Sequence, residues 1–371
     1  MYLNTDDPGE KNQWQGRLIT GNNSSFPAQP PDNALYRYRW PQAKLEDSRF
    51  QSFSAAGRPP AHLEYQLCNG IQVGTIANVD RRWRKLQDYY FNCIRDNDTQ
   101  LVRILNELDA LGLSEKTIIV FTSDHGELCG AHQMNGKGTC TYKQQVRVPL
   151  FIVHPDFPGG KDCHALTCHL DIIPTLAGLT GRKNTEDNAL LASRKGADIS
   201  PLLFFPERYP VNYLRDAILY CYDMLMYSDA TYIGNMFKVI RDETLSSEEK
   251  KHRFNTFTPD LNKRGGIRMI FDGKYKFTRY FSLQQHHIPE TPEILRRYND
   301  LELYDLQSDP QEMHNLAADK QYSSLVDHMN DKLNRLYRKE IGTKDDGHYI
   351  PQLKGLKWSL DPEVTAYLLR D

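Results

Sequence analysis

The sequence predicts an α/β fold in which helices cover a sheet, followed by a small antiparallel sheet with one packed helix. Residues 117–122 and 148–153 form short, continuous apolar runs without the polar alternation of a half-exposed strand. Such runs are typical of strands that are buried on both faces of a parallel sheet. Helical patterns precede the first run and follow the second, and this order is the one found in doubly wound α/β domains.

Two helices are expected to flank these strands. Residues 88–111 place apolar side chains close to one face of a helix, at Ile94, Leu101, Ile104, Leu105, Leu108 and Leu111. Gly112 follows them, where a helix commonly ends in a left-handed residue. Residues 170–178 predict a second helix, with Pro174 in its first turn, where proline is tolerated.

The C-terminal stretch carries its own strand and helix patterns. Residues 268–277 predict two strands joined by a turn at Asp272-Gly273, and residues 301–305 predict a third. From Tyr322 onward an amphipathic helix is expected, with apolar positions at Leu325, Met329, Leu333, Leu336 and Tyr337. The tyrosine and arginine residues of this stretch are expected to pack and pair at the surface.

Composition divides the chain and excludes several classes of protein. We expect two units, residues 1–204 and 205–371, with residues 1–80 mostly irregular because the opening is rich in Pro, Asn, Gln and Ser.

The net charge of −2, with 46 basic and 48 acidic residues, argues against nucleic acid as a partner. No apolar run approaches the roughly 18–20 residues of a membrane span, so no membrane partner is expected. No signal peptide is visible at the start of the sequence. The seven cysteines include no C-x-x-C pair and favour a reducing compartment such as the cytoplasm, although the localisation stays open.

Asp124 and His125 follow the first apolar run and precede a glycine. In open α/β sheets, chemistry lies beyond the carboxyl ends of the strands. A carboxylate and an imidazole side by side suit a divalent cation. The alternative is that Asp124 caps a turn and His125 is an ordinary loop residue.

Several ordered motifs resemble the sulfatase family of the alkaline-phosphatase superfamily, including its arylsulfatase and phosphonate monoester hydrolase members. The resemblance covers more than sixty consecutive residues and resumes near the C-terminus. The motifs are Thr-Ile-Ile-Val-Phe-Thr-Ser-Asp-His-Gly-Glu (117–127), Gly-Ala-His (130–132), Gly-Lys-Gly-Thr-Cys-Thr-Tyr (136–142), Arg-Val-Pro-Leu-Phe-Ile-Val (147–153), His-Leu-Asp-Ile-Ile-Pro-Thr-Leu (169–176), Gly-Ala-Asp-Ile-Ser-Pro-Leu-Leu (196–203), Glu-Leu-Tyr-Asp-Leu-Gln-Ser-Asp-Pro-Gln-Glu (302–312) and Asn-Leu (315–316).

The resemblance implies roles for four residues. Asp124 and His125 would be two ligands of a divalent metal ion, with Ca²⁺ expected first and Mn²⁺ or Zn²⁺ as alternatives. Lys137 would bind the sulfate or phosphonate oxyanion and stabilise the leaving group, a task that suits a mobile ammonium with three donors. The alternative for Lys137 is a solvated lysine between two turn-forming glycines. His132 would contact the metal ligands without binding the ion itself, or would be a polar loop histidine.

The sequence also departs from the family pattern. The family nucleophile lies in Cys/Ser-x-Pro-x-Arg, where it becomes a formylglycine, and none of the seven cysteines is followed two residues later by Pro. The family's first Asp pair has no counterpart after an apolar strand, and His62, in Pro-rich surroundings, is a poor substitute for the family's upstream histidine. The expectation is therefore an N-terminally incomplete sulfatase-like sheet. Residues 1–204 would be the C-terminal part of the catalytic domain, and residues 205–371 its C-terminal subdomain.

The function implied by the resemblance is metal-assisted hydrolysis of a small-molecule sulfate ester, with this chain inactive alone because the nucleophile is absent. Alternatives are a phosphonate or phosphate ester hydrolase of the same superfamily, or a non-catalytic pseudoenzyme or interaction protein. The missing N-terminal segment, or a second copy in a homo-oligomer, is the expected protein partner.

A rival interpretation places structural zinc at Cys163-His164 and Cys168-His169, because four such ligands lie within seven residues.

Overall fold

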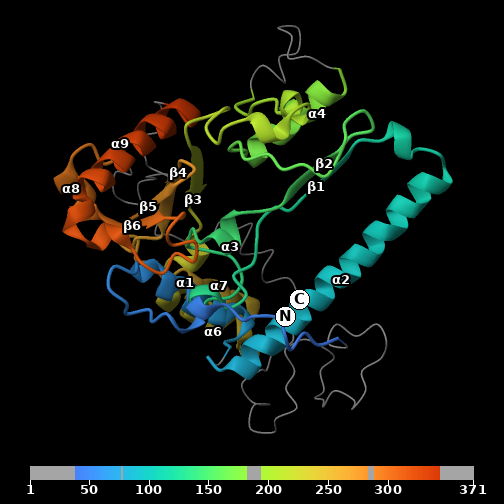
Figure 1. Cartoon of the computed structure of the whole chain (residues 1–371). Helices are drawn as coiled ribbons and strands as arrows, with labels where there is room; N and C mark the ends of the chain where they lie inside the picture. The colour runs from blue at the N-terminus through green and yellow to red at the C-terminus, as the bar shows by residue number, and fades with distance from the viewer. Residues whose placement is uncertain (1–37, 77, 182–193, 283–287, 343–371) are drawn as a thin grey trace.

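The computed structural model describes residues 38–76, 78–181, 194–282 and 288–342, which form a mixed α/β arrangement with two antiparallel sheets (Figure 1). The strands are β1 (Ile119–Thr122), β2 (Leu150–Val153), β3 (Ile218–Tyr222), β4 (Gly266–Phe271), β5 (Tyr275–Phe281) and β6 (Asn299–Asp305). The α-helices are α1 (Pro60–Val73), α2 (Asp80–Ala110), α3 (Lys143–Val146), α4 (Ile172–Leu179), α6 (Ala230–Arg241), α7 (Ser247–Phe254), α8 (Pro292–Tyr298) and α9 (Ser323–Glu340).

β1 and β2 confirm the two predicted strands but not their predicted surroundings. They pair antiparallel, with Thr122 opposite Leu150, so the expectation of parallel strands is wrong. One face packs through Leu150 and Ile152 onto a small apolar cluster. The opposite face leaves Phe121, Phe151 and Val153 exposed by 44%, 61% and 57%, so burial on both faces is wrong as well. A short apolar run indicates a hydrophobic strand, but it does not indicate the direction of the neighbouring strand.

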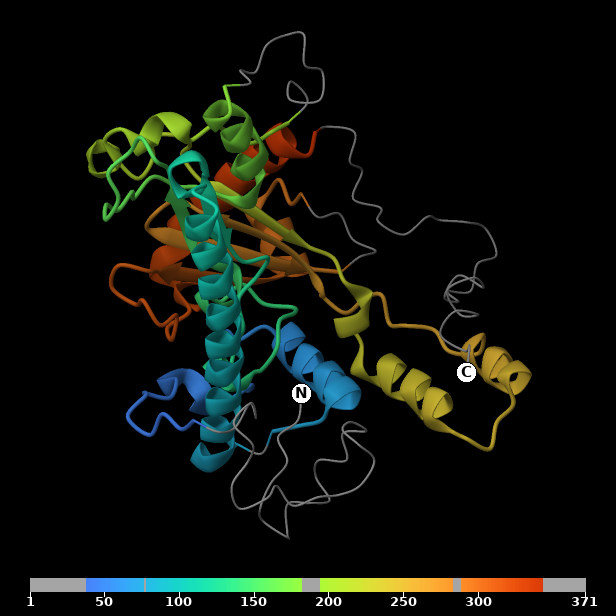
Figure 2. The same ribbon diagram turned by 90° about the vertical axis from the view of Figure 1, so that its right-hand side faces the viewer.

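α2 confirms the predicted helix and its end. Gly112 has a φ of 65°, and the amides after the helix turn back onto its last carbonyls, as in a left-handed C-terminal cap. The first half of α2 buries Trp83 and Leu86, whereas Ile104 and Leu111 of the predicted apolar face are 60% and 61% exposed. Figures 1 and 2 show α2 as a long rod along one side of the molecule. Although α2 has 31 residues, neither it nor another helix in the described ranges is apolar enough to cross a membrane.

The C-terminal sheet has the predicted hairpin and the predicted helix. Its order is β3-β4-β5-β6, antiparallel throughout, and Gly273 turns between β4 and β5 with a φ of 95°. The face of α9 that carries Met329 and Leu333 packs on the sheet residues Phe277 and Leu303 in the largest apolar cluster. The expectation of surface arginine and tyrosine residues is wrong for several of them, because the structure buries and pairs Arg268, Arg279, Tyr280 and Tyr304.

α1 is the element that sequence analysis missed, since it lies in the region expected to be mostly irregular. The helix starts with Pro60 at its first position, where the missing N–H costs nothing. Its buried face combines Ala61, Tyr65 and Cys68, which have helical spacing, with the polar side chains of His62 and Asn69, so the apolar stripe is short and interrupted. α1 lies beneath the loop that follows β1 and also contacts α6, and it therefore supports the candidate site.

Candidate functional site

Asp124 and His125 lie side by side directly after β1. The Asp124 Oδ2 atom is 3.2 Å from His125 Nε2, and Asp124 Oδ1 accepts a hydrogen bond from the His125 amide. The hydrogen bond from this amide, together with the neighbouring imidazole, lowers the pKa of Asp124. Both side chains are exposed, by 82% and 40%, so solvent and ligands can reach them. At Gly126 a Cβ atom would fall 1.9 Å from the carbonyl oxygen of Gln144, so this turn accepts only glycine.

This pair fits a divalent cation only in part. Within the described ranges, no group of three or more His, Cys, Asp or Glu side chains comes together to hold a metal ion. His169 lies nearby, but its Nε2 atom is within hydrogen-bond distance of the Ser123 carbonyl oxygen, at 2.8 Å. Asp124 and His125 can therefore offer two ligands and would leave the remaining coordination to water or to groups from elsewhere.

The rival zinc interpretation is not supported in the described part of the chain, where no such cluster includes the four residues proposed for it. Cys163 is exposed, and the Cys168 thiol accepts a hydrogen bond from Arg215. All seven cysteines are free thiols.

Lys137 stands exposed on the loop between β1 and α3, flanked by Gly136 and Gly138. The ring of Tyr65 lies directly under both glycines: a Cβ atom at Gly138 would be 1.9 Å from the ring, and one at Gly136 would be 2.8 Å from the hydroxyl. Within the ranges that the structure describes, the Lys137 ammonium has no hydrogen-bond or ion-pair partner. It is therefore available to a ligand.

Glu127 and Gln145 connect the two parts of the site, and sequence analysis missed both. A carboxylate oxygen of Glu127 accepts the amide of Gly136 at 2.5 Å, and the side-chain oxygen of Gln145 accepts the amide of Gly138 at 2.7 Å. The backbone oxygen of Gln145 also accepts the amide of Gly126, next to the Asp-His pair. Glu127 closes the motif at residues 117–127, but the motif gave it no role, and Gln145 lies outside the quoted motifs.

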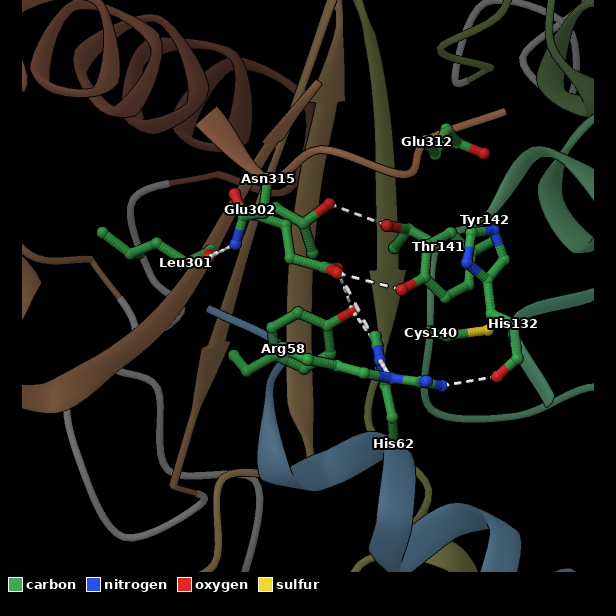
Figure 3. Close-up of polar contacts among 12 residues, drawn as sticks. Arg58, His62, His132, Cys140, Thr141, Tyr142, Leu301, Glu302, Glu312 and Asn315 are labelled. Atoms are coloured by element: carbon green, nitrogen blue, oxygen red, sulfur yellow. Dashed lines mark hydrogen bonds and ion pairs between the residues drawn. The ribbon is translucent and has the colours of Figure 1, made fainter. Parts of the chain in front are cut away.

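His132 lies in the loop where the sequence places it, and it is a buried residue; its support of the metal ligands stays a prediction. The side chain is fully buried and stacks on Tyr142, with ring centroids 3.4 Å apart. Its Nδ1 atom lies 2.6 Å from the side-chain oxygen of Gln51, and its carbonyl oxygen accepts a hydrogen bond from Arg58 (Figure 3). Burial, followed by the charges of Arg58 and Lys276, lowers the pKa of His132 to about 2. These hydrogen bonds and the ring stacking join His132 to Gln51, Arg58 and Tyr142, and none of these three contacts involves Asp124 or His125.

His62 belongs to a buried hydrogen-bonded chain that joins α1 to the C-terminal sheet. Arg58 Nε donates to His62 Nδ1, so the ring carries its proton on Nε2 and donates to the Tyr280 hydroxyl at 2.8 Å. Tyr280 in turn donates to Glu302 at 2.7 Å, and Tyr304 donates to the other carboxylate oxygen. Burial and the Arg58 charge lower the pKa of His62 well below its usual value. No sequence pattern marks this chain of hydrogen bonds, because its link between α1 and the sheet joins His62 to Tyr280, 218 positions away.

An ion pair between Lys276 and Glu312 ties the same sheet to the loop. Both side chains are almost completely buried, at 2% and 0% exposed. Lys276 also donates to the carbonyl oxygen of Thr141, and Glu312 accepts the amide of Lys143 at 2.7 Å. Thr141 is further bound to Thr278 of β5 through their hydroxyls (Figure 3). The loop that carries Lys137 is thus anchored at its far end to the C-terminal sheet.

Comparison with known proteins gives matches along both parts of the chain. The family described as Sulfatase matches residues 10–182, and the family described as N-sulphoglucosamine sulphohydrolase, C-terminal, matches residues 270–339. The chain is 34% identical over 130 residues to an ulvan-active sulfatase of Formosa agariphila, a match that covers 34% of this chain and 24% of that protein.

Solved structures share the fold. The chain is similar to the 2-O GAG sulfatase BT1596, with a TM-score of 0.58, 19% identity and coverage of 88% of this chain and 57% of that one. It is also similar to the phosphonate monoester hydrolase SpPMH from Silicibacter pomeroyi, with a TM-score of 0.55, 19% identity and coverage of 83% and 51%. The chain spans about a quarter of the curated relative and little more than half of these two structures. The predicted α/β fold of the alkaline-phosphatase type is confirmed.

Proposed function

Because this chain belongs to the sulfatase family of the alkaline-phosphatase superfamily, we propose that it takes part in the hydrolysis of a small-molecule sulfate ester. The observation that carries the proposal is the exposed Lys137 ammonium, which has no partner among the described residues and lies on the same loop as the exposed Asp124–His125 pair. A tetrahedral oxyanion that met this loop would find a mobile cation at its surface.

In this proposal each residue has a separate task. Lys137 donates hydrogen bonds to the sulfate oxygens and offsets the charge that grows on the leaving oxygen. Asp124 and His125 contribute two ligands to a divalent cation, with Ca²⁺ proposed first and Mn²⁺ or Zn²⁺ as alternatives. Such an ion, when bound, polarises an ester oxygen. We also propose that the chain divides at residues 204 and 205 into an α/β unit and a C-terminal unit.

Phosphonate and phosphate monoesters are the second candidate substrates. Their tetrahedral oxyanions offer Lys137 the same geometry and charge, and the chain shares its fold with a phosphonate monoester hydrolase. A non-catalytic role remains the third possibility, in which the loop binds an oxyanion without turning it over.

We expect the purified 371-residue chain alone to hydrolyse neither an aryl sulfate nor a phosphonate monoester at a measurable rate. Its sequence contains no Cys-x-Pro-x-Arg or Ser-x-Pro-x-Arg segment, and electrostatic groups without a nucleophile have no covalent step to assist. The measurement is release of a chromogenic alcohol by wild type and by the Lys137→Ala variant. Turnover by wild type that disappears in the variant would contradict the expected inactivity.

The metal should bind weakly to this chain alone. Two ligands leave most of the coordination shell to water, so calorimetric titration with Ca²⁺, Mn²⁺ or Zn²⁺ should show no site tighter than roughly micromolar. Asp124→Ala should remove whatever binding is seen, while Asp156→Ala, at another exposed loop carboxylate, should leave it unchanged. A stoichiometric metal ion that survives dialysis against a chelator would show that further ligands complete the site.

A further inference from the structure

We propose that Glu127 and Gln145 are positioning residues that hold Lys137 in place for an oxyanion. The inference rests on the proposed function of Lys137 and adds the residues that set its location. It begins from the backbone, because the two amides that flank Lys137, those of Gly136 and Gly138, are each bound by a side chain rather than by a regular element.

Glu127 provides the first attachment. It lies three residues after Asp124, and the same carboxylate oxygen accepts the Gly136 amide at 2.5 Å and the Cys129 amide at 3.2 Å. In addition, the amide of Leu128 donates to the carbonyl oxygen of Gly136. The segment that leaves the Asp-His pair is thereby paired with the segment that enters Lys137. A charged acceptor makes such hydrogen bonds stronger than a neutral one does.

Gln145 provides the second attachment, and it holds both segments at once. Its side chain is buried, and it both accepts from the Gly138 amide and donates to the carbonyl oxygens of Gly138 and Cys140. Its backbone oxygen accepts the amide of Gly126 at 2.8 Å. One residue therefore fixes the distance between the turn after His125 and the turn after Lys137.

Tyr65 forms the floor of this arrangement. Its hydroxyl donates to the carbonyl oxygen of Asn135 at 2.6 Å, and its ring occupies the space that a side chain at Gly138 would need. With the floor and both amides fixed, the Lys137 backbone has little freedom, while its side chain remains free to reach a ligand. Preorganised donors cost less to bring to a developing charge than mobile ones do.

The test uses the full chain and inorganic sulfate as the probe. Acetylation of Lys137 is followed by mass spectrometry over a range of sulfate concentrations, with chloride at matched ionic strength and Lys251 of α7 as the internal reference. Hydrogen exchange of the segment 134–140 is measured on the same samples. The variants are Glu127→Ala, Gln145→Ala and the conservative Glu127→Gln, which keeps an oxygen acceptor. Glu249→Ala, which removes the cap of α7, is the control for a general loss of stability.

We expect Glu127→Ala and Gln145→Ala to raise the sulfate concentration needed for half-protection of Lys137 about fivefold or more, and to speed exchange in the segment 134–140. Glu127→Gln and Glu249→Ala should stay within about twofold of wild type. Protection that is unchanged in both alanine variants would overturn the positioning role and leave the proposed function standing. Absence of sulfate protection in wild type itself would overturn the oxyanion role of Lys137, and the positioning role with it.

Discussion

Replacing Glu312 by glutamine should lower the free energy of unfolding by about 3–5 kcal/mol, because it leaves the buried Lys276 ammonium without its carboxylate. Removing one partner of a buried ion pair costs this much, because the remaining charge lies away from water and has lost the carboxylate that it contacts. The substituted amide keeps the shape of the side chain and can still accept the Lys143 amide. Urea unfolding at constant pH, followed by circular dichroism, measures the change.

The matched control removes an exposed pair instead. Glu290 and Arg338 are 69% and 40% exposed, so Glu290→Gln should cost about 0–1 kcal/mol. The double variant Lys276→Met/Glu312→Gln should recover much of the loss, because it leaves no unpaired charge behind. A Glu312→Gln variant as stable as the Glu290→Gln control would mean that this pair does not hold the loop to the C-terminal sheet.

The 371-residue chain alone should self-associate through the β1–β2 sheet, by its exposed apolar face and its open strand edges. Phe121, Phe151 and Val153 present an apolar surface there, and within the described residues each of the two strands has only one hydrogen-bonded neighbour. An apolar strand with free backbone donors and acceptors is a template for pairing with another chain. Sedimentation velocity at rising concentrations should therefore show species heavier than one chain.

Two substitutions locate the contact. Phe151→Glu should return the chain toward a single species with little loss of stability, since this side chain is 61% exposed. Ile294→Glu replaces another exposed apolar residue, in the first turn of α8 where an acidic side chain is favourable, and it should not change the association. A monodisperse monomer of the wild-type chain would contradict this prediction and would favour the non-catalytic role.

Much of the secondary structure could be predicted because the relevant signals are local. α2 and its glycine cap, α9, the β4–β5 hairpin and the positions of β1 and β2 each follow from spacing or turn residues within a few positions. The direction of the β1–β2 pairing could not be predicted, since it depends on which chain segment lies beside each strand. α1 was missed because the face it buries mixes polar with apolar side chains and because the helix begins at a Pro-rich stretch.

The residues of the candidate site also differ in whether the sequence could predict them. Asp124, His125 and Lys137 stand out because a motif contains them, and their roles remain proposals. The roles of Glu127 and Gln145 were missed because their partners are backbone amides two and nine positions along the chain from Glu127 and seven from Gln145, and the residue types at those positions do not reveal such bonds. His62 and His132 were undervalued because their burial comes from partners far away in the chain, such as Tyr280 and Gln51.

The central claim is that Lys137 forms an oxyanion site within this chain, and the most direct measurement is the acetylation rate of Lys137 in the wild-type protein with and without sulfate. The account predicts that sulfate in roughly the millimolar range slows acetylation of Lys137, whereas acetylation of Lys251 stays the same at matched ionic strength. Equal slowing of both lysines, or of neither, would contradict it.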